Sequence, residues 1–241
     1  MTFRFLSLAL ASVALLGLSA CASSPDGEIA DPIEGVNRGV FKFNDAVDTA
    51  VLRPVAKGYR EAVPQPARTG IRNFLRNLKS PTIIANNLLQ GDLEGVGNST
   101  TRMAANTVFG VGGIFDVAGA EGVRYEEEDF GQTLGVWGVG NSPYIVLPLL
   151  GPSSARDATG MIVDSYADPV RLWLTNTDNE GWYYALVGVK TIDTREGLLD
   201  ILDDLKKNSI DYYAATRSSY AQRREALVRD ESPEASNLPD M

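Results

Sequence analysis

The stretch "FGQTLGVWGVGNSPYIVLPLLGP" (residues 130–152) decides which folds this chain can form. It is apolar, but glycines and prolines interrupt it every few residues, and the stretch "FGVGGIFDVAGAEG" (109–122) has the same character. Glycine in a helix interior costs roughly 1 kcal/mol relative to alanine, so long regular helices are not expected here. Such a segment buries little side-chain area but permits close backbone packing and a bent path. We therefore predict an irregular, apolar middle.

Helical periodicity precedes this middle. Residues 31–53 repeat apolar side chains at roughly helical spacing, and Pro54 is expected to interrupt the pattern. Residues 66–79 form an amphipathic helix that we expect to end at Pro81, with Ile71, Phe74, Leu75 and Leu78 on one face. A further apolar segment ends at Gly91, and Asn98 and Ser99 are placed to cap the next helix.

Helical patterns return after Asp157. They include an amphipathic helix that Thr194 is expected to cap and a long polar helix that starts near Ser209. The fold class predicted is mostly α, with short helices and helical hairpins in one domain over residues 31–230. Residues 231–241 are expected to form a disordered tail.

The N-terminus carries an export and anchoring signal. A basic start is followed by the apolar run Phe5–Ala20, too short for a membrane span, and then by Leu18-Ser19-Ala20-Cys21. Residues 1–20 are therefore interpreted as a lipoprotein signal peptide, Cys21 as the lipidated residue and residues 21–30 as a tether. Ser23, where an aspartate would retain many lipoproteins at the inner membrane, favours the outer membrane. An ordinary signal peptide with an incidental cysteine is the alternative.

Composition excludes several kinds of site. The chain has no histidine and a single cysteine, so Ser-His-Asp triads, histidine zinc helices and structural disulfides are excluded. We expect no catalytic residue, no metal site and no cofactor. The net charge of −9 argues against nucleic acid as a partner. A hydrolase that uses two carboxylates stays open as an alternative, although no pair of acids stands out.

Two groups of side chains allow a functional and a structural interpretation. Arg68, Arg72 and Arg76 on the basic helix match lipid phosphates, but they match carboxylates of this acidic chain equally well. The aromatic residues fit either a belt at a membrane interface or an ordinary core, and composition favours the core slightly; they are Trp137, Trp173, Trp182, Tyr144, Tyr183 and Tyr184.

Several longer segments carry a resemblance to a known family. They are "DPIEGVNRGVFKFN" (31–44), "RPVAKGYREAVPQPARTGIRNFLRNLKSP" (53–81), "NNLLQGD" (86–92), "DFGQTLGVWGVGNSPYIVLPLLGPSSARD" (129–157) and "DSYADP" (164–169). Together they resemble the MlaA/VacJ lipoproteins over about residues 31–175.

The resemblance implies a fold and a function. The fold would be a helical ring in one membrane leaflet around an amphipathic channel, docked against a trimeric porin. The function would be to remove misplaced phospholipids from the outer leaflet of the outer membrane and pass them to the periplasmic carrier MlaC, which maintains lipid asymmetry. The protein would be lipid-anchored in the outer membrane of a Gram-negative bacterium, facing the periplasm, and not an enzyme. A passive scaffold bound to a porin, without lipid transport, is the alternative.

The family motifs also imply site residues for the ring or its channel. They match in three places, with the glycine-rich middle added: Asn37, Arg38, Phe41, Phe43 and Asn44; Phe130 and Gly131; Pro143, Tyr144 and Pro148; Gly110 and Gly113. The basic side chains Arg68, Arg72 and Arg76 would be the headgroup contacts. The late helices, about residues 180–229, are expected partly on the periplasmic side, where the carrier would dock.

Overall fold

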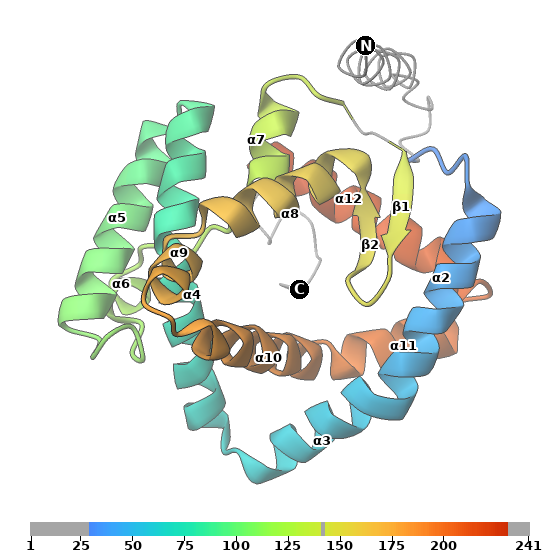
Figure 1. Ribbon diagram of the computed structural model, residues 1–241, viewed down its shortest axis with the longest axis horizontal. Coiled ribbons are helices and arrows are strands. Elements are labelled where there is room, and N and C mark those ends of the chain that lie inside the picture. The colour runs from blue at the N-terminus through green and yellow to red at the C-terminus, as the bar shows by residue number, and fades with distance from the viewer. Residues whose placement is uncertain (1–28, 141–142, 231–241) are drawn as a thin grey trace.

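The computed structural model describes residues 29–140 and 143–230. The signal peptide, Cys21, most of the tether and the tail 231–241 lie outside the described residues. Figure 1 shows helices arranged as a ring: α2 and α3 follow one side, α4 and α5 the opposite side, and α10 and α11 cross between them. The expectation of a mostly α fold is confirmed, with a single two-stranded sheet in the described part.

The first arm of the ring is helical throughout. It consists of α2 (Glu34–Val47), the π-helical turn η1 (Asp48–Leu52) and α3 (Arg53–Ala62). The expected interruption at Pro54 is wrong. The Arg53 backbone N–H donates to the Asp48 carbonyl, five residues back, and Pro54 occupies the first turn of α3. The wider π turn relieves the clash between a proline ring and the carbonyl one turn earlier, so the helical path continues.

The second arm is longer than the sequence pattern suggested. α4 (Gln65–Gln90) runs through Pro81, so the expected end there is wrong. The proline removes one backbone hydrogen bond, and the Ser80 hydroxyl donates to the Arg76 carbonyl at 3.4 Å. The half of α4 beyond Pro81 packs against α5 (Leu93–Val108), where Asn87 donates to Ser99 in a buried hydrogen bond. This packing outweighs the loss at the proline.

The turn between the two helices has strong local signals. Gly91 ends α4 as expected, with φ of 80°, a conformation that favours glycine. α5 begins at Leu93 instead of near Asn98, because the Asp92 carboxylate accepts from the backbone N–H groups of Glu94 and Gly95.

The glycine-rich middle contains no long helix, as predicted. It forms two short helices, α6 (Val117–Ala120) and α7 (Phe130–Val136), and an antiparallel hairpin that the sequence analysis did not anticipate, β1 (Tyr144–Leu147) and β2 (Gly151–Ser154). Gly113 has φ of 96°, and a Cβ there would lie 2.4 Å from the Asn77 Cβ. Glycine therefore lets this loop lie directly on α4.

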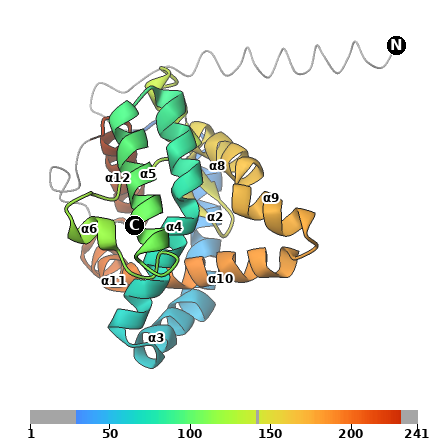
Figure 2. The same cartoon turned by 90° about the vertical axis from the view of Figure 1, so that its left-hand side faces the viewer.

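The last third of the chain closes the ring. It contains α8 (Ala155–Ala167), α9 (Pro169–Asn176), α10 (Glu180–Gly197), α11 (Leu199–Asn208) and α12 (Tyr212–Val228). Thr194 lies inside α10, so its expected role as a cap is wrong; Asp193 and Glu196 bind arginines of the first arms, and the helix continues past them. α12 starts at Asp211, which accepts from the Ala214 N–H. In Figure 2 the turn between α9 and α10 projects away from the ring.

Candidate functional site

Two asparagines on α2 hold the hairpin. Asn37 is fully buried; its amide donates to the Tyr144 carbonyl at 3.0 Å and accepts from the Val146 N–H at 3.0 Å. One face further along, Asn44 donates to the Leu147 carbonyl at 2.9 Å and accepts from the Leu149 N–H at 2.8 Å. Each amide pairs with the strand edge as another strand would. The two side chains therefore satisfy the free edge of β1.

The other family-motif residues of α2 differ in surroundings. Arg38 binds Asp211 at 2.7 Å and lies 4.3 Å above the Tyr213 ring, and the Phe41 ring meets that ring edge-on at 5.4 Å. Phe43 is exposed and contributes to the outer surface.

The glycine and proline positions of the motifs lie at close approaches or at the hairpin. A Cβ at Gly110 would lie 2.2 Å from the Phe115 carbonyl oxygen, and Gly113 lies on α4 as described above. Pro143 precedes β1 and its carbonyl accepts from Ala155, whereas Pro148 is exposed in the hairpin turn. Tyr144 is fully buried.

A buried ion-pair network, which we call the Arg224 cluster, joins α7, α8 and α12. It consists of Arg224, Asp129, Asp157, Arg156 and Tyr220. Arg224 binds Asp129 at 2.7 Å and Asp157 at 2.8 Å, and the Tyr220 hydroxyl donates to Asp157. Although burial opposes ionisation, the Arg224 guanidinium holds the pKa of Asp129 well below its usual range. The network is closed on itself and fixes the three helices.

Phe130 and Gly131 belong to the same crossing. The Phe130 N–H donates to Asp164 at 2.8 Å, and the Phe130 ring meets Trp137 edge-on. A Cβ at Gly160 of α8 would lie 2.3 Å from the Gly131 backbone nitrogen, so the two helices touch backbone to backbone. The sequence analysis missed Arg224, because one arginine in a polar helix has no distinguishing signal.

A second network, the Glu196 cluster, joins the first arms to α10. It consists of Glu196, Asp193, Arg60, Arg68 and Arg72. Glu196 accepts from Arg60 at 2.8 Å and from Arg68, and Arg72 binds Asp193 at 3.0 Å and Glu196 at 3.3 Å. Two of the three arginines predicted to contact headgroups therefore bind carboxylates. The third, Arg76, lies 4.6 Å above the Tyr125 ring.

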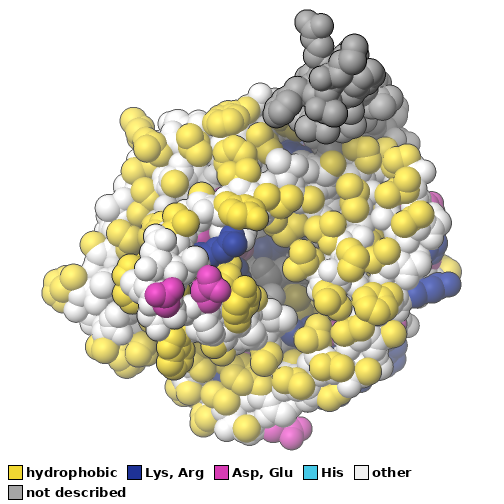
Figure 3. All heavy atoms as spheres, in the orientation of Figure 1, with side chains coloured by type: hydrophobic (Ala, Val, Ile, Leu, Met, Phe, Trp, Pro, Cys, Tyr) yellow, Lys and Arg dark blue, Asp and Glu magenta, His cyan; other side chains and the backbone are white. Residues whose placement is uncertain are grey.

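The outer surface is unusually apolar. Large apolar side chains that are more than half exposed occur on almost every element; they include Val36, Phe43, Val51, Leu88, Leu93, Val108, Phe109, Val111, Phe115, Trp137, Leu149, Leu150, Ile162, Tyr166, Trp173, Trp182 and Tyr184. Figure 3 shows apolar side chains spread over the visible face, with a hollow near its middle and Lys and Arg side chains at the edge of that hollow. The three tryptophans are exposed, so the core interpretation is wrong for them and right for Tyr144.

The interior shows the opposite pattern. Buried residues include Asn37, Gln132, Thr133, Ser153, Ser154 and Asp157, while the main cluster of buried apolar side chains comprises Ile29, Tyr144, Val146, Tyr213, Tyr220 and Ala221. Polar groups inside and apolar groups outside reverse the arrangement of a water-soluble domain. Within the described residues, no helix combines the length and apolar character needed to cross a bilayer.

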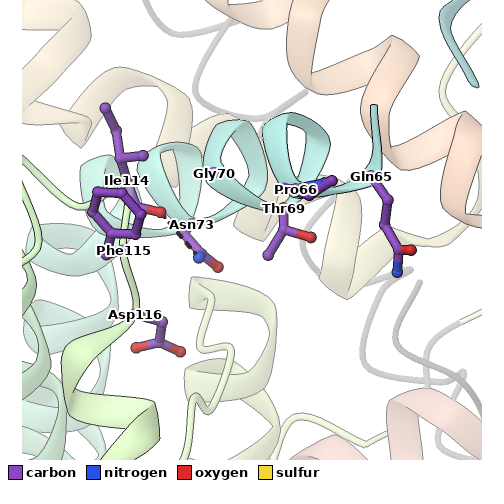
Figure 4. Close-up of a pocket in the computed structure, with 8 residues that line it drawn as sticks. All are labelled: Gln65, Pro66, Thr69, Gly70, Asn73, Ile114, Phe115 and Asp116. Atoms are coloured by element: carbon purple, nitrogen blue, oxygen red, sulfur yellow. Dashed lines mark hydrogen bonds between the residues drawn. The ribbon is translucent and has the colours of Figure 1, made fainter. Parts of the chain in front are cut away.

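An outer groove lies between the first turns of α4 and the loop before α6. Figure 4 shows Thr69 and Asn73 on the same side of α4, with Phe115 and Asp116 across from them. The Asp116 carboxylate is bound by Arg102 at 2.8 Å and by Asn106 at 2.9 Å. Since this charge is already matched, the groove is a weak candidate for binding an ion.

Comparison with known proteins gives the family. A family model described as MlaA lipoprotein matches residues 29–227. The chain belongs to the MlaA lipoprotein family. The resemblance seen in the sequence motifs is thereby confirmed, and it extends through the late helices, which carry no motif recognised in the sequence analysis.

Individual MlaA proteins are similar over most of their length. The "Intermembrane phospholipid transport system lipoprotein MlaA" of Escherichia coli (strain K12) is 38% identical over 250 residues, covering 100% of this chain and 97% of the relative. The protein of the same name from Haemophilus influenzae is 34% identical, covering 99% and 96%. A solved structure described as "Structural basis for maintenance of bacterial outer membrane lipid asymmetry" has a TM-score of 0.72 and 39% identity, covering 83% of this chain and 99% of that one.

Proposed function

We propose that this protein is an outer-membrane lipoprotein that removes misplaced phospholipids from the outer leaflet and passes them to a periplasmic carrier. Membership of the MlaA family and similarity to a lipoprotein named for intermembrane phospholipid transport support this function. No bond is broken in such a process, so the absence of a histidine from the sequence is no obstacle.

One observation carries the proposal: apolar side chains face outward while charged and polar ones face inward. Contiguous apolar surface beyond a few hundred Å² marks a binding surface for a membrane or another protein. Since the described residues contain no membrane-crossing helix, we infer that the ring lies within one leaflet. A phospholipid headgroup pays a large cost to enter bare hydrocarbon, and a polar path through the ring lowers it.

The anchor and the partners complete the proposal. Lipidation of Cys21 would hold the ring in the outer membrane, because two or more acyl chains anchor a protein stably. The apolar rim would dock against a trimeric porin. The carrier MlaC would receive the lipid on the periplasmic side, where we place part of α10, α11 and α12. Arg76 is the best remaining candidate for a headgroup contact among the three arginines of α4.

The test is the amount of phospholipid in the outer leaflet of intact cells. A membrane-impermeant amine reagent labels exposed phosphatidylethanolamine in the wild type, in a deletion strain and in the complemented strain. We expect labelling to rise on deletion and to return on complementation. Unchanged labelling, with the protein anchored and expressed, would instead support the passive porin-bound scaffold. Accumulated lysophospholipid or released headgroup would point to a hydrolase.

A further inference from the structure

Lys190 has an unusual position on α10. Its side chain is accessible to water, yet burial among surrounding atoms, with repulsion from Lys79, lowers its pKa. Both observations hold for a side chain in the wall of a hollow. Lys190 forms no hydrogen bond and no close ion pair with any described residue. It lies one turn before Asp193, whose carboxylate binds Arg72 on α4, so it faces the inner side of the ring.

The charges nearest to Lys190 leave a net positive charge. Lys79 of α4 binds Glu127 at 2.6 Å, and the pKa of Glu127 is lowered, chiefly by Lys79. The pKa of Lys79 is raised, since the attraction of Glu127 outweighs burial. Glu127 is thus matched by Lys79. Asp168, the other acid that interacts with Lys190, accepts from the Val170 N–H at the start of α9.

A third cation lies near this pair. Arg76, one helical turn before Lys79, lies 4.6 Å above the Tyr125 ring, and both Arg76 and Lys79 interact electrostatically with the Tyr125 hydroxyl. Figure 3 shows Lys and Arg side chains at the edge of the central hollow. A cluster of cations facing a hollow in a chain of net charge −9 is not expected from composition. Partly desolvated ammonium groups interact strongly with an arriving anion.

We propose that Lys190, with Lys79 beside it, binds the phosphodiester group of a phospholipid as the lipid passes through the ring. The inference rests on the proposed function and names the group that recognises its substrate. The ammonium of Lys190 supplies the charge, and an anion between the two lysines relieves their repulsion. Val187 and Val189, exposed on the same helix, offer apolar surface for the acyl chains. Any phosphodiester lipid fits this site, whatever its headgroup alcohol.

The first experiment measures phospholipid that stays bound to the full lipidated protein during purification in detergent. The variants are K190E, K190M and K190R, with K207E as the matched control, because Lys207 is an exposed lysine of α11. A charged hydrogen bond contributes about 1.5–3 kcal/mol, so K190E is expected to lower bound phosphorus per protein about tenfold. K190R and K207E should retain the wild-type amount. K190M, which removes charge without adding a carboxylate, should fall between.

A second experiment identifies the recognised group. Acetylation of Lys190, read by mass spectrometry, is followed on delipidated protein with dihexanoyl phosphatidylglycerol, dihexanoylglycerol or inorganic phosphate at equal concentration. Protection by the phospholipid alone supports the proposal. Equal protection by dihexanoylglycerol would show that the phosphate is not recognised, and equal protection by inorganic phosphate would show a general anion site; either result overturns the assignment.

Failure of the inference is distinct from failure of the proposed function. Wild-type protein that carries no phospholipid and leaves outer-leaflet labelling unchanged would overturn the function itself. Wild-type protein that carries phospholipid, together with a K190E variant that carries as much, would overturn only the role of Lys190. Unchanged circular dichroism for the K190 variants shows that a loss of lipid is not a loss of fold.

Discussion

The Arg224 cluster and the Glu196 cluster use the same chemistry in different surroundings. In the Arg224 cluster the side chains of Arg224 and Asp157 are 13% and 8% exposed, and Arg224 alone bridges two carboxylates. In the Glu196 cluster Arg72 is 39% exposed, and each carboxylate has more than one donor, since the Tyr59 hydroxyl also reaches Asp193. The first network depends on one residue, whereas the second is redundant. The difference separates a structural joint from a joint that can tolerate change.

The largest effect is expected for Arg224→Met. The substitution leaves Asp129 and Asp157 buried without their main partner, and breaking a buried pair in this way costs about 3–5 kcal/mol. Denaturant unfolding of the purified protein, followed by circular dichroism, measures the loss. Lys207→Met, which removes a charge from the exposed face of α11, is the control and should leave the free energy of unfolding unchanged. Equal stability of the two variants would show that the cluster is not a joint.

A pH-dependent effect of a few kcal/mol is expected next to the same cluster. Burial raises the pKa of Glu128 to about 8, while its neighbour Asp129 stays ionised beside Arg224. Since the folded pKa lies above the unfolded one, stability is full below about pH 4.5 and is lost as the pH rises towards 8. Glu128→Gln, which keeps a group that can bond Gln90, should remove this loss. Unfolding curves at pH 5 and pH 9 for both proteins measure it; an equal pH dependence would contradict the assignment.

These two clusters also show what sequence reasoning could reach. Asp129 was found through the "DFGQTLG" motif, but its partner Arg224 lies 95 residues away on a helix of ordinary polar composition. Local patterns carry no information about which distant charge completes a pair. Lys190 was missed for the same reason, because its character comes from Lys79 and Glu127 on other elements.

Helix ends show a similar division. The αL glycine at Gly91 was predicted, since the signal is local. Pro54 and Pro81 were predicted to stop helices and do not, because a π turn accommodates one and packing against α5 outweighs the other. The exposure of the tryptophans was not decided by sequence, since an apolar residue faces lipid or core with the same pattern.

A smaller effect is expected in the Glu196 cluster. Arg72→Met removes the charged partner of Asp193, but Asp193 keeps the Tyr59 hydroxyl at 3.2 Å and Glu196 keeps Arg60 and Arg68. We expect a loss of about 1 kcal/mol, as for a partly exposed pair. The same unfolding assay applies, and lipid labelling in cells shows whether Arg72 also contributes to transport. A loss as large as that of Arg224→Met would remove the distinction between redundant and closed clusters.

The smallest expected effect is the response of each cluster to salt. Partly exposed charges are screened when the Debye length falls from about 10 Å at 0.1 M salt to about 3 Å at 1 M, whereas buried pairs are screened much less. A double-mutant cycle of Arg72→Met with Asp193→Asn should give a coupling energy of a few tenths of a kcal/mol at low salt that vanishes at high salt. The cycle of Arg224→Met with Asp129→Asn should keep its coupling. If both couplings fell together, water would reach the two clusters equally, and the greater burial of Arg224 would have no energetic consequence.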